Sequence, residues 1–267
     1  MFEIERKSRK FGDKFNPDNV LQMRSRNEEF VESAMFKNTL LKSLDKQTIL
    51  RLGLNPVKFE LNHEMEYPHR PIKHLYFLES GMASMTATFQ DGSQVEVSTF
   101  GFESVIGVSA LMGAKKSLNR VYIQIAGHGY SCPIEAARKE FRLGGDFQYL
   151  ALRYVQAQLD QATQYVGCNA KHHFEPRLAR WLLVCADRSH SDIFKMSHEL
   201  LADMLGGTRA TVSLAAASLK RKGLIQYSRG VIRILDSAGL ERNACECYQV
   251  IKFHLKNYAE FETTLVE

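Results

Sequence analysis

Four residues at the start of one helical segment carry side chains suited to contact with the edges of nucleic-acid bases. Arg209, Ala210, Ser213 and Leu214 are spaced so that they face outward together on one helix. The forked guanidinium of Arg209 can donate two hydrogen bonds to guanine O6 and N7 in a major groove. Contact from Arg209 to phosphate alone is the alternative. We therefore expect these four side chains to meet base edges of double-stranded DNA.

A second set of polar and basic side chains is suited to phosphate contact, and its members are Thr208, Thr211, Lys220 and Lys222. Such groups position a protein on DNA without discriminating between sequences. The local charge agrees with this interpretation, because Lys195 to Asp236 contains Lys195, Arg209, Lys220, Arg221, Lys222, Arg229 and Arg233 against only Glu199, Asp203 and Asp236. The segment is a candidate phosphate-facing surface.

Two crossing helices are predicted between Ser197 and Lys222. Ser197 is placed to cap the first helix and Thr208 the second, and Gly206 permits the left-handed backbone of a tight turn. Ala202 is small where the helices approach each other. The expected buried residues are Leu200, Leu201 and Leu205 on the first helix and Val212, Ala215, Ala216 and Leu219 on the second. This pattern predicts a helix-turn-helix whose recognition helix is Thr208–Lys222.

A β-hairpin is expected directly after this motif. Gly223 is placed to end the second helix, and the apolar runs 224–227 and 231–235 flank an Arg229-Gly230 turn. The combination predicts a winged helix-turn-helix. An ordinary helical hairpin followed by a strand pair is the structural alternative.

Residues 57–133 alternate in short apolar runs separated by turn formers. The predicted strands include 74–79, 82–89, 95–100, 105–106, 121–126 and 129–132, with turns at Ser80-Gly81 and Asp91-Gly92. About eight short strands in so few residues indicate a barrel, roll or sandwich. Residues 38–52 are expected to form one or two short helical turns.

A helix of about six turns is predicted from Asp146 to Asn169, after the Gly144-Gly145 break. It carries two apolar stripes, one of Phe147, Leu150, Tyr154 and Ala157 and another of Leu152, Val155, Leu159, Ala162 and Val166. One stripe is expected to pack on the chain's own β domain and the other on a second subunit. Burial of the helix inside a single large domain is the alternative.

The segment His172–Pro176 is predicted to be a hinge, with a new helix over 177–187, because the residue before a proline disfavours helical backbone. No cysteine or carboxylate stands at helical ligand spacing from both His172 and His173, so we expect both to be solvated polar residues. The five cysteines, Cys132, Cys168, Cys185, Cys245 and Cys247, are scattered and odd in number, which favours free thiols. Cys245 and Cys247 form a Cys-x-Cys pair with no second cysteine pair nearby, so a zinc site is the lesser alternative and we expect no metal site.

Composition narrows the classes of protein. The net charge of +5 suits a polyanionic partner without requiring one. No apolar run is long enough to cross a bilayer, so we expect a cytoplasmic protein without membrane contact. No Ser/His/Asp set, carboxylate pair or phosphate-cradling glycine loop stands out, so we do not expect an enzyme.

The order of a β-roll, a long helix, a hinge and a winged helix-turn-helix resembles the CRP/FNR family of bacterial transcription regulators. The resemblance covers residues 38–240 and is carried by HLYFLESG (74–81), DG (91–92), GFESVIG (101–107), EPRLARWLL (175–183) and the helix-turn-helix. It implies an α+β fold with an N-terminal double-stranded β-helix, or jelly-roll-like β-roll. The implied domains are an extension (1–37), a cyclic-nucleotide-binding-like β-roll (38–145), a dimerisation helix with hinge (146–174) and a winged DNA-binding domain with a C-terminal helical tail (175–267).

The family's cyclic-nucleotide signature is only partly present. Arg120 matches the phosphate-binding arginine, but Val108 replaces the ribose-binding glutamate and Val121 the following serine, and the threonine-serine pair of the long helix corresponds to Ala162-Thr163. Arg120, Val108, Val121 and Thr163 are therefore the candidate effector-pocket residues. Because most of the polar groups are missing, we expect weak cyclic-AMP binding or none, and we assign no other effector or cofactor.

Two other family features also differ. No cysteine precedes Cys132, so the N-terminal iron-sulfur cluster of one family branch is not expected. Ala210 and Leu214 replace a glutamate and an arginine common in the recognition helix, so the operator should differ from known ones. The resemblance implies a homodimer on a two-fold symmetric operator, with RNA polymerase as a further candidate partner. A small-molecule sensor acting through protein-protein contacts rather than DNA is the alternative function.

Overall fold

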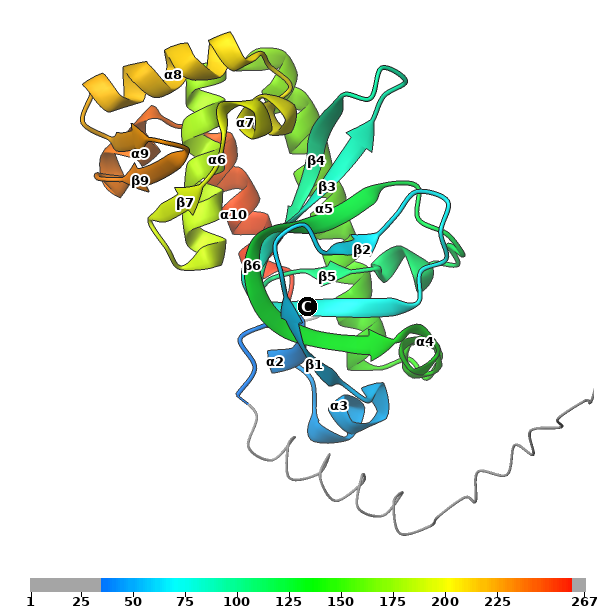
Figure 1. Ribbon diagram of the computed structural model, residues 1–267. Helices are drawn as coiled ribbons and strands as arrows, with labels where there is room; N and C mark the ends of the chain where they lie inside the picture. The colour runs from blue at the N-terminus through cyan, green and yellow to red at the C-terminus, as the bar shows by residue number, and fades with distance from the viewer. Residues whose placement is uncertain (1–34, 261–267) are drawn as a thin grey trace, which may run out of the picture. The chain divides into compact units, whose positions relative to one another are not determined.

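The computed structural model describes residues 35–260 (Figure 1). The extension predicted over residues 1–37 lies outside the described residues except for its last three positions. No helix of residues 35–260 is both long and apolar enough to cross a lipid bilayer.

The first part of the described chain is an antiparallel β-roll preceded by two short helices. The elements are α2 (Thr39–Lys42), α3 (Lys46–Leu52), β1 (Asn55–Phe59), β2 (Glu64–Glu66), β3 (His74–Thr88), β4 (Gln94–Phe100), β5 (Val105–Ile106) and β6 (Arg120–Pro133). The six-stranded sheet has the order β1-β6-β3-β4, with β2 paired to β6 and β5 paired to β3. A core around Phe59, Leu78 and Phe100 lies inside it. The predicted roll and α+β class are confirmed.

Two strands are longer than predicted. β3 runs through Ser80-Gly81, where a hairpin turn was expected, and its pairing with β6 shifts register there as β-bulges do. Gly81 has φ +87°, and a Cβ on Gly127 of β6 would lie 2.1 Å from the Ser80 carbonyl oxygen. The glycines therefore mark a bulge in paired strands rather than chain reversal. β6 likewise joins two segments predicted to be separate strands, which is why the sheet has fewer and longer strands than expected.

The long helix α5 (Asp146–Lys171) follows α4 (Ile134–Arg142). The first predicted stripe is buried in the chain, and it consists of Phe147, Leu150, Tyr154 and Ala157. The second stripe differs, because Leu152, Leu159 and Val166 are 46%, 56% and 70% exposed. The alternative of a helix buried on all sides within one domain is therefore wrong for the described chain.

The C-terminal part surrounds α6 and ends in a helical tail. Its elements are α6 (Phe174–Ser189), β7 (Ile193–Lys195), α7 (His198–Leu205), α8 (Arg209–Arg221), β8 (Ile225–Ser228), β9 (Val231–Ile234), α9 (Ser237–Asn243) and α10 (Cys247–Asn257). The wing has the strand order β7-β9-β8, so a third strand joins the predicted hairpin. Arg229 and Gly230 both have positive φ, of 50° and 74°, as a tight hairpin turn requires.

The hinge is shorter than predicted. α6 begins at Phe174, so Pro176 lies inside the first turn of the helix rather than starting it. Proline is tolerated there because the first four N–H groups of a helix have no acceptor within it. Only His172 and His173 connect α5 to α6.

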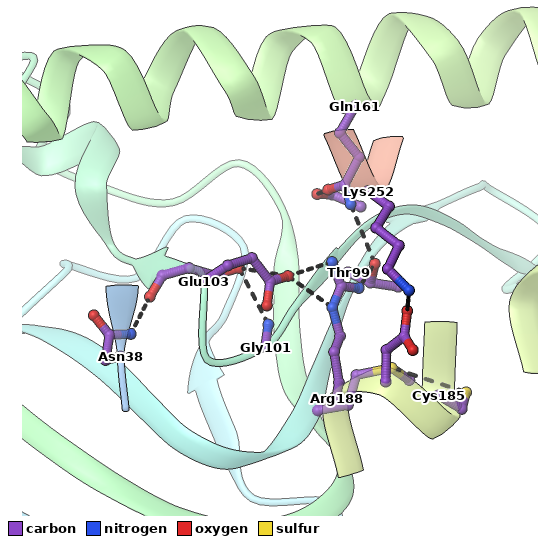
Figure 2. A network of polar contacts seen from close by, with 12 residues as sticks. Asn38, Thr99, Gly101, Glu103, Gln161, Cys185, Arg188 and Lys252 are labelled. Carbon is purple, nitrogen blue, oxygen red and sulfur yellow. Dashed lines mark hydrogen bonds and ion pairs between the residues drawn. The ribbon is translucent and has the colours of Figure 1, made fainter. Parts of the chain in front are cut away.

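Buried polar contacts join the β-roll to α6 (Figure 2). Arg188 of α6 forms an ion pair with Glu103, and its guanidinium also donates to the Thr99 hydroxyl. Gln161 of α5 donates to the same hydroxyl at 3.3 Å. The end of the network reaches α2, where the Asn38 amide donates to the Ser104 carbonyl at 2.9 Å. These contacts connect α2, the loop after β4, α5 and α6.

A second buried contact lies nearby on β4. The indole of Trp181 in α6 donates to Glu96 at 2.9 Å, and Ser84 of β3 donates to the other carboxylate oxygen at 2.6 Å. Burial raises the pKa of Glu96 to about 7, although both hydrogen bonds and the charges of Arg180 and Arg188 oppose the shift. The position of α6 on the β3–β4 hairpin thus depends on a carboxyl group that titrates near neutral pH.

Candidate DNA-binding interface

The turn between α7 and α8 holds the two helices at a close crossing. Ser197 accepts a hydrogen bond from the Leu200 amide and Thr208 accepts one from the Thr211 amide, which confirms both predicted caps. Gly206 follows α7 with φ +59°, as the tight turn requires.

Gly207 is required for a reason that the sequence pattern did not reveal. A Cβ at this position would lie 2.3 Å from the ring of Phe174, the first residue of α6. The ring therefore occupies the space that a side chain would need. This contact joins the turn to the first residue after the hinge.

The outer face of α8 presents three of the four predicted base-contact residues. Arg209, Ala210 and Leu214 are exposed, and the side chain of Leu214 is the largest apolar group there. Arg209 Nε lies 2.9 Å from Glu199 Oε1, in a pair whose side chains are 74% and 58% exposed. A pair this exposed stabilises little, so the guanidinium can leave it at small cost. α8 lies at the edge of the winged part, with its outer side uncovered in Figure 1.

Ser213 differs from the other three because it is half-buried and engaged within the protein. Its hydroxyl lies 2.8 Å from His198 Nδ1 and also donates to the Arg209 carbonyl at 2.9 Å. The His198 ring stacks on Tyr227 of the wing at 4.4 Å between centroids. Burial lowers the pKa of His198, which favours a neutral ring in this stack. Ser213 thus contributes to the connection between α7, α8 and the wing.

The predicted phosphate-contact residues fall into three situations. Lys220 is exposed on α8. Thr208 and Thr211 share a hydroxyl contact of 2.8 Å beside the helix N-terminus, where backbone N–H groups and the helix dipole favour an anion. Lys222 is engaged elsewhere, since its ammonium lies 2.6 Å from Glu175 and 2.8 Å from Asn243.

The winged part of the chain matches a known domain family. Residues 176–243 match the Crp-like helix-turn-helix domain family, a range that contains α7, α8 and the wing. Residues 176–243 thus form a Crp-like helix-turn-helix domain, and the chain as a whole is similar to CRP/FNR-type transcription regulators. It is thus a DNA-binding transcription regulator, and its relatives are regulators rather than enzymes.

Two curated relatives and one solved structure indicate the extent of this similarity. The global nitrogen regulator of Nostoc sp. is 27% identical over 195 residues, covering 69% of this chain and 86% of the relative. The transcriptional regulator LdrP of Thermus thermophilus is 28% identical over 183 residues, covering 64% and 87%. A CRP/FNR-family regulator from Eubacterium rectale superposes with a TM-score of 0.62 at 16% identity, covering 76% and 96%, and supports the fold.

The candidate effector residues do not line one common cavity. Val108 lines a cavity of about 160 Å³ beside Glu66 and Gln158, whereas Arg120 lines a neighbouring open hollow that shares Leu118 with it. The Arg120 guanidinium pairs with Glu64 at 2.8 Å and lies over the Tyr122 ring.

The two remaining candidates lie in neither hollow. Val121 is fully buried in the roll core, and Thr163 is exposed with its hydroxyl donating to the Leu159 carbonyl. The cavity at Val108 is also smaller than the roughly 300 Å³ from which small-molecule pockets start. The expectation of little or no cyclic-AMP binding stays a prediction, and it now has a geometric reason.

Proposed function

We propose that the regulator binds a two-fold symmetric DNA operator as a homodimer, with the N-terminal half of α8 in the major groove. The observation that carries this proposal is the uncovered face of Arg209, Ala210 and Leu214 beyond the tight Gly206-Gly207 turn. An arginine fork and an exposed apolar side chain are the groups that contact guanine and a thymine methyl, respectively. Lys220 and the Thr208–Thr211 helix start are proposed to contact phosphate.

The proposed dimer forms through α5. Leu152, Leu159 and Val166 are seven residues apart and exposed, so they lie on one side of the helix as a coiled-coil seam does. A second copy of the chain offers the same stripe, and a two-fold axis along the seam would place two copies of α8 for two half-sites. The homodimer is supported by this repeat of exposed apolar residues.

The β-roll is proposed to act as a structural or effector-sensing module whose connection to DNA binding runs through α6. Two buried residues of α6, Trp181 and Arg188, donate hydrogen bonds to Glu96 and Glu103 of the β-roll. The roll therefore contacts the helix that precedes α7 and α8. We propose that the regulator acts in the cytoplasm on transcription by RNA polymerase, as an operator-bound protein can do by contact or by obstruction.

The test is selection of duplexes from a random DNA library with the purified full-length chain, followed by affinity measurements over a range of salt concentrations. We expect a palindromic consensus and a linear fall of log affinity with log salt. Arg209→Ala should weaken binding to the selected site about 10- to 100-fold and relax preference at one position of each half-site. If the variant keeps the wild-type ratio between its affinities for selected and scrambled duplexes, Arg209 is not a base reader.

Two matched variants separate the kinds of contact. Lys220→Ala should weaken binding to all duplexes alike and reduce the salt slope by about one. Lys222→Ala should change affinity less than Lys220→Ala, because Glu175 and Asn243 already hold the Lys222 ammonium. Failure to enrich any duplex would instead favour a sensor that acts through protein contacts.

A further inference from the structure

Three cysteines and one histidine meet beside the hinge. Cys168 and His172 lie at the end of α5, and Cys245 and Cys247 lie at the α9–α10 connection. One ligand atom from each of the four residues lies within 4.8 Å of every other. The three thiols are buried and His172 is half-buried. Cys245 and Cys247 come after residue 243, where the match to the family's DNA-binding domain ends.

Two distances within this cluster are close to those between ligands of one tetrahedral ion, and the others stay within 4.8 Å. Cys168 Sγ lies 3.5 Å from Cys245 Sγ, and Cys247 Sγ lies 3.6 Å from His172 Nδ1. With Zn–S bonds near 2.3 Å and Zn–N bonds near 2.0 Å, a tetrahedron has S–S edges of about 3.8 Å and S–N edges of about 3.5 Å. The four side chains are thus close to their coordinating positions already.

Two other uses of the cysteines fit less well. A disulfide needs sulfur atoms about 2.05 Å apart, whereas all five cysteines are unpaired. An iron-sulfur cluster distributes its protein ligands over several iron atoms, so cysteine sulfurs bound to different irons lie farther apart than ligands of a single ion. The compact cluster favours a mononuclear site.

Two further side chains, Glu246 and Gln164, hold His172 and Cys247 in orientations suited to metal binding. His172 Nε2 lies 3.1 Å from Glu246 Oε1, which leaves Nδ1 directed at the thiols. A carboxylate holding the second nitrogen of a ligating histidine is a recurrent feature of zinc sites. The Gln164 amide donates to Cys247 Sγ at 3.0 Å, a hydrogen bond that stabilises a thiolate.

A buried positive charge supplies an independent indication that the cluster holds an anionic complex. Arg180 is 2% exposed, and among residues 35–260 its Nε and Nη1 have no hydrogen-bond partner. Its guanidinium lies over the Tyr165 ring and interacts electrostatically with Cys168 and Cys245 as well as with Glu96. Three thiolates around one divalent cation carry a net charge of −1, which would compensate this arginine.

We propose that Cys168, His172, Cys245 and Cys247 bind one Zn²⁺ ion in tetrahedral geometry. Binding replaces three thiol protons, which leave to solvent, with three Zn–S bonds and adds one bond from neutral His172 Nδ1, while Nε2–H donates to Glu246. The ion requires no oxidant or reductant. Thiolate and imidazole ligands in a closed four-coordinate set are typical of structural zinc sites.

The ion would fasten the C-terminal tail to the long helix. α10 runs antiparallel to α5, because Cys247 lies beside Gln164, His254 beside Asp160 and Tyr258 beside Tyr154. The site lies where the C-terminal end of α5 meets the start of α10, and its ligand His172 is two residues before α6 begins. Zn²⁺ therefore stabilises the α5–α10 contact at the hinge.

The test uses the full-length chain with Zn²⁺ and with Co²⁺ as a spectroscopic probe. We expect one tightly held Zn²⁺ per chain that survives dialysis and is released when a mercurial blocks the thiols. Substitution by Co²⁺ should give the absorption bands of a tetrahedral thiolate complex, and removal of metal should lower the melting temperature. Dialysed protein without zinc, an octahedral Co²⁺ spectrum, or a Cys168–Cys245 disulfide in place of bound metal would each overturn the proposal.

Variants inside and outside the cluster locate the site, and one of them changes only an exposed side chain. Glu246→Gln changes an exposed side chain and should weaken Zn²⁺ affinity about 10- to 100-fold while leaving the fold intact. Cys247→Ser and His172→Ala should abolish tight binding, whereas His173→Ala and Cys132→Ala, outside the cluster, should retain it. Equal Zn²⁺ affinity in Glu246→Gln, Cys247→Ser and wild type would contradict the assignment.

Discussion

Glycines at the α7–α8 turn serve two different needs. Gly206 adopts a positive φ of 59°, whereas Gly207 has no side chain because the Phe174 ring fills the space beside it. Only the first need could be inferred from the sequence, since left-handed backbone after a helix is a local property. The second depends on Phe174 of α6, which lies more than thirty positions earlier in the chain.

Gly207→Ala is expected to destabilise the protein by about 1–3 kcal/mol, the usual effect of an extra methyl group in a tightly packed contact. The displaced Phe174 ring should also shift the turn and weaken DNA binding. Gly167→Ala is the matched control, because Gly167 lies within α5 and a Cβ there meets no atom within 4 Å. That control should stabilise the protein by up to about 1 kcal/mol. Urea denaturation of both variants checks the difference, and equal stabilities would contradict the packing argument.

The ligand cluster of Cys168, His172, Cys245 and Cys247 could not be predicted from local sequence spacing. No ligand is spaced correctly from both His172 and His173, yet His172 alone takes part, with Cys168 of α5 four positions before it. The expectation that His172 is a solvated polar residue is wrong, while His173 is exposed as predicted. A Cys-x₃-His spacing combined with Cys-x-Cys was the available signal, but only folding brings the two pairs together.

Contacts between elements determine how α6 sits on the β-roll, and Glu96 makes one of them sensitive to pH. Its pKa is raised from 4.5 to about 7 by burial. Between these values the folded state binds a proton that the unfolded state has lost, so stability declines as pH rises from about 5 to 7. The decline attributable to this group is at most about 3 kcal/mol.

Glu96→Gln should therefore remove part of the pH dependence and be more stable than wild type at pH 8, since the amide oxygen can still accept from Trp181. Melting temperatures from pH 5 to pH 8 measure the difference, with Glu60→Gln as an exposed control. Trp181 is the only tryptophan of the chain, so its fluorescence should titrate near pH 7 in wild type and not in the variant. If the melting temperature changes with pH in the same way in both proteins, ionisation of Glu96 is not the cause of the pH dependence of stability.

Element boundaries were predictable where local chemistry sets them. Ser197, Thr208 and Gly206 mark the ends of α7 and α8, and the Gly144-Gly145 break precedes α5. Long-range pairing decides the rest. β3 continues through Ser80-Gly81 because β6 pairs with it from His74 to Thr86, and glycine is needed there to let the two backbones approach.

At the scale of the whole molecule, the described chain uses the two sides of α5 differently. One stripe packs within the chain, and α10 covers a further part of the helix through Cys247, His254 and Tyr258. The stripe at Leu152, Leu159 and Val166 is left exposed by both. The proposed zinc site and the proposed dimer seam therefore belong to one helix without competing for the same residues, so each can be disrupted separately.

Leu159→Glu is expected to separate the proposed dimer, because it places two like charges at the centre of an apolar seam. Sedimentation equilibrium should give twice the mass of the chain for wild type and the mass of one chain for the variant. Binding to a single half-site should persist in the variant, while affinity for the full palindrome should fall, because the second half-site no longer binds within the same complex. Leu118→Glu introduces the same charge at a leucine that is 80% exposed on the β-roll, and it should leave both mass and DNA affinity unchanged. A Leu159→Glu variant that keeps the dimer mass while Zn²⁺ binding is intact would show that the subunits associate through a surface other than the exposed stripe of α5.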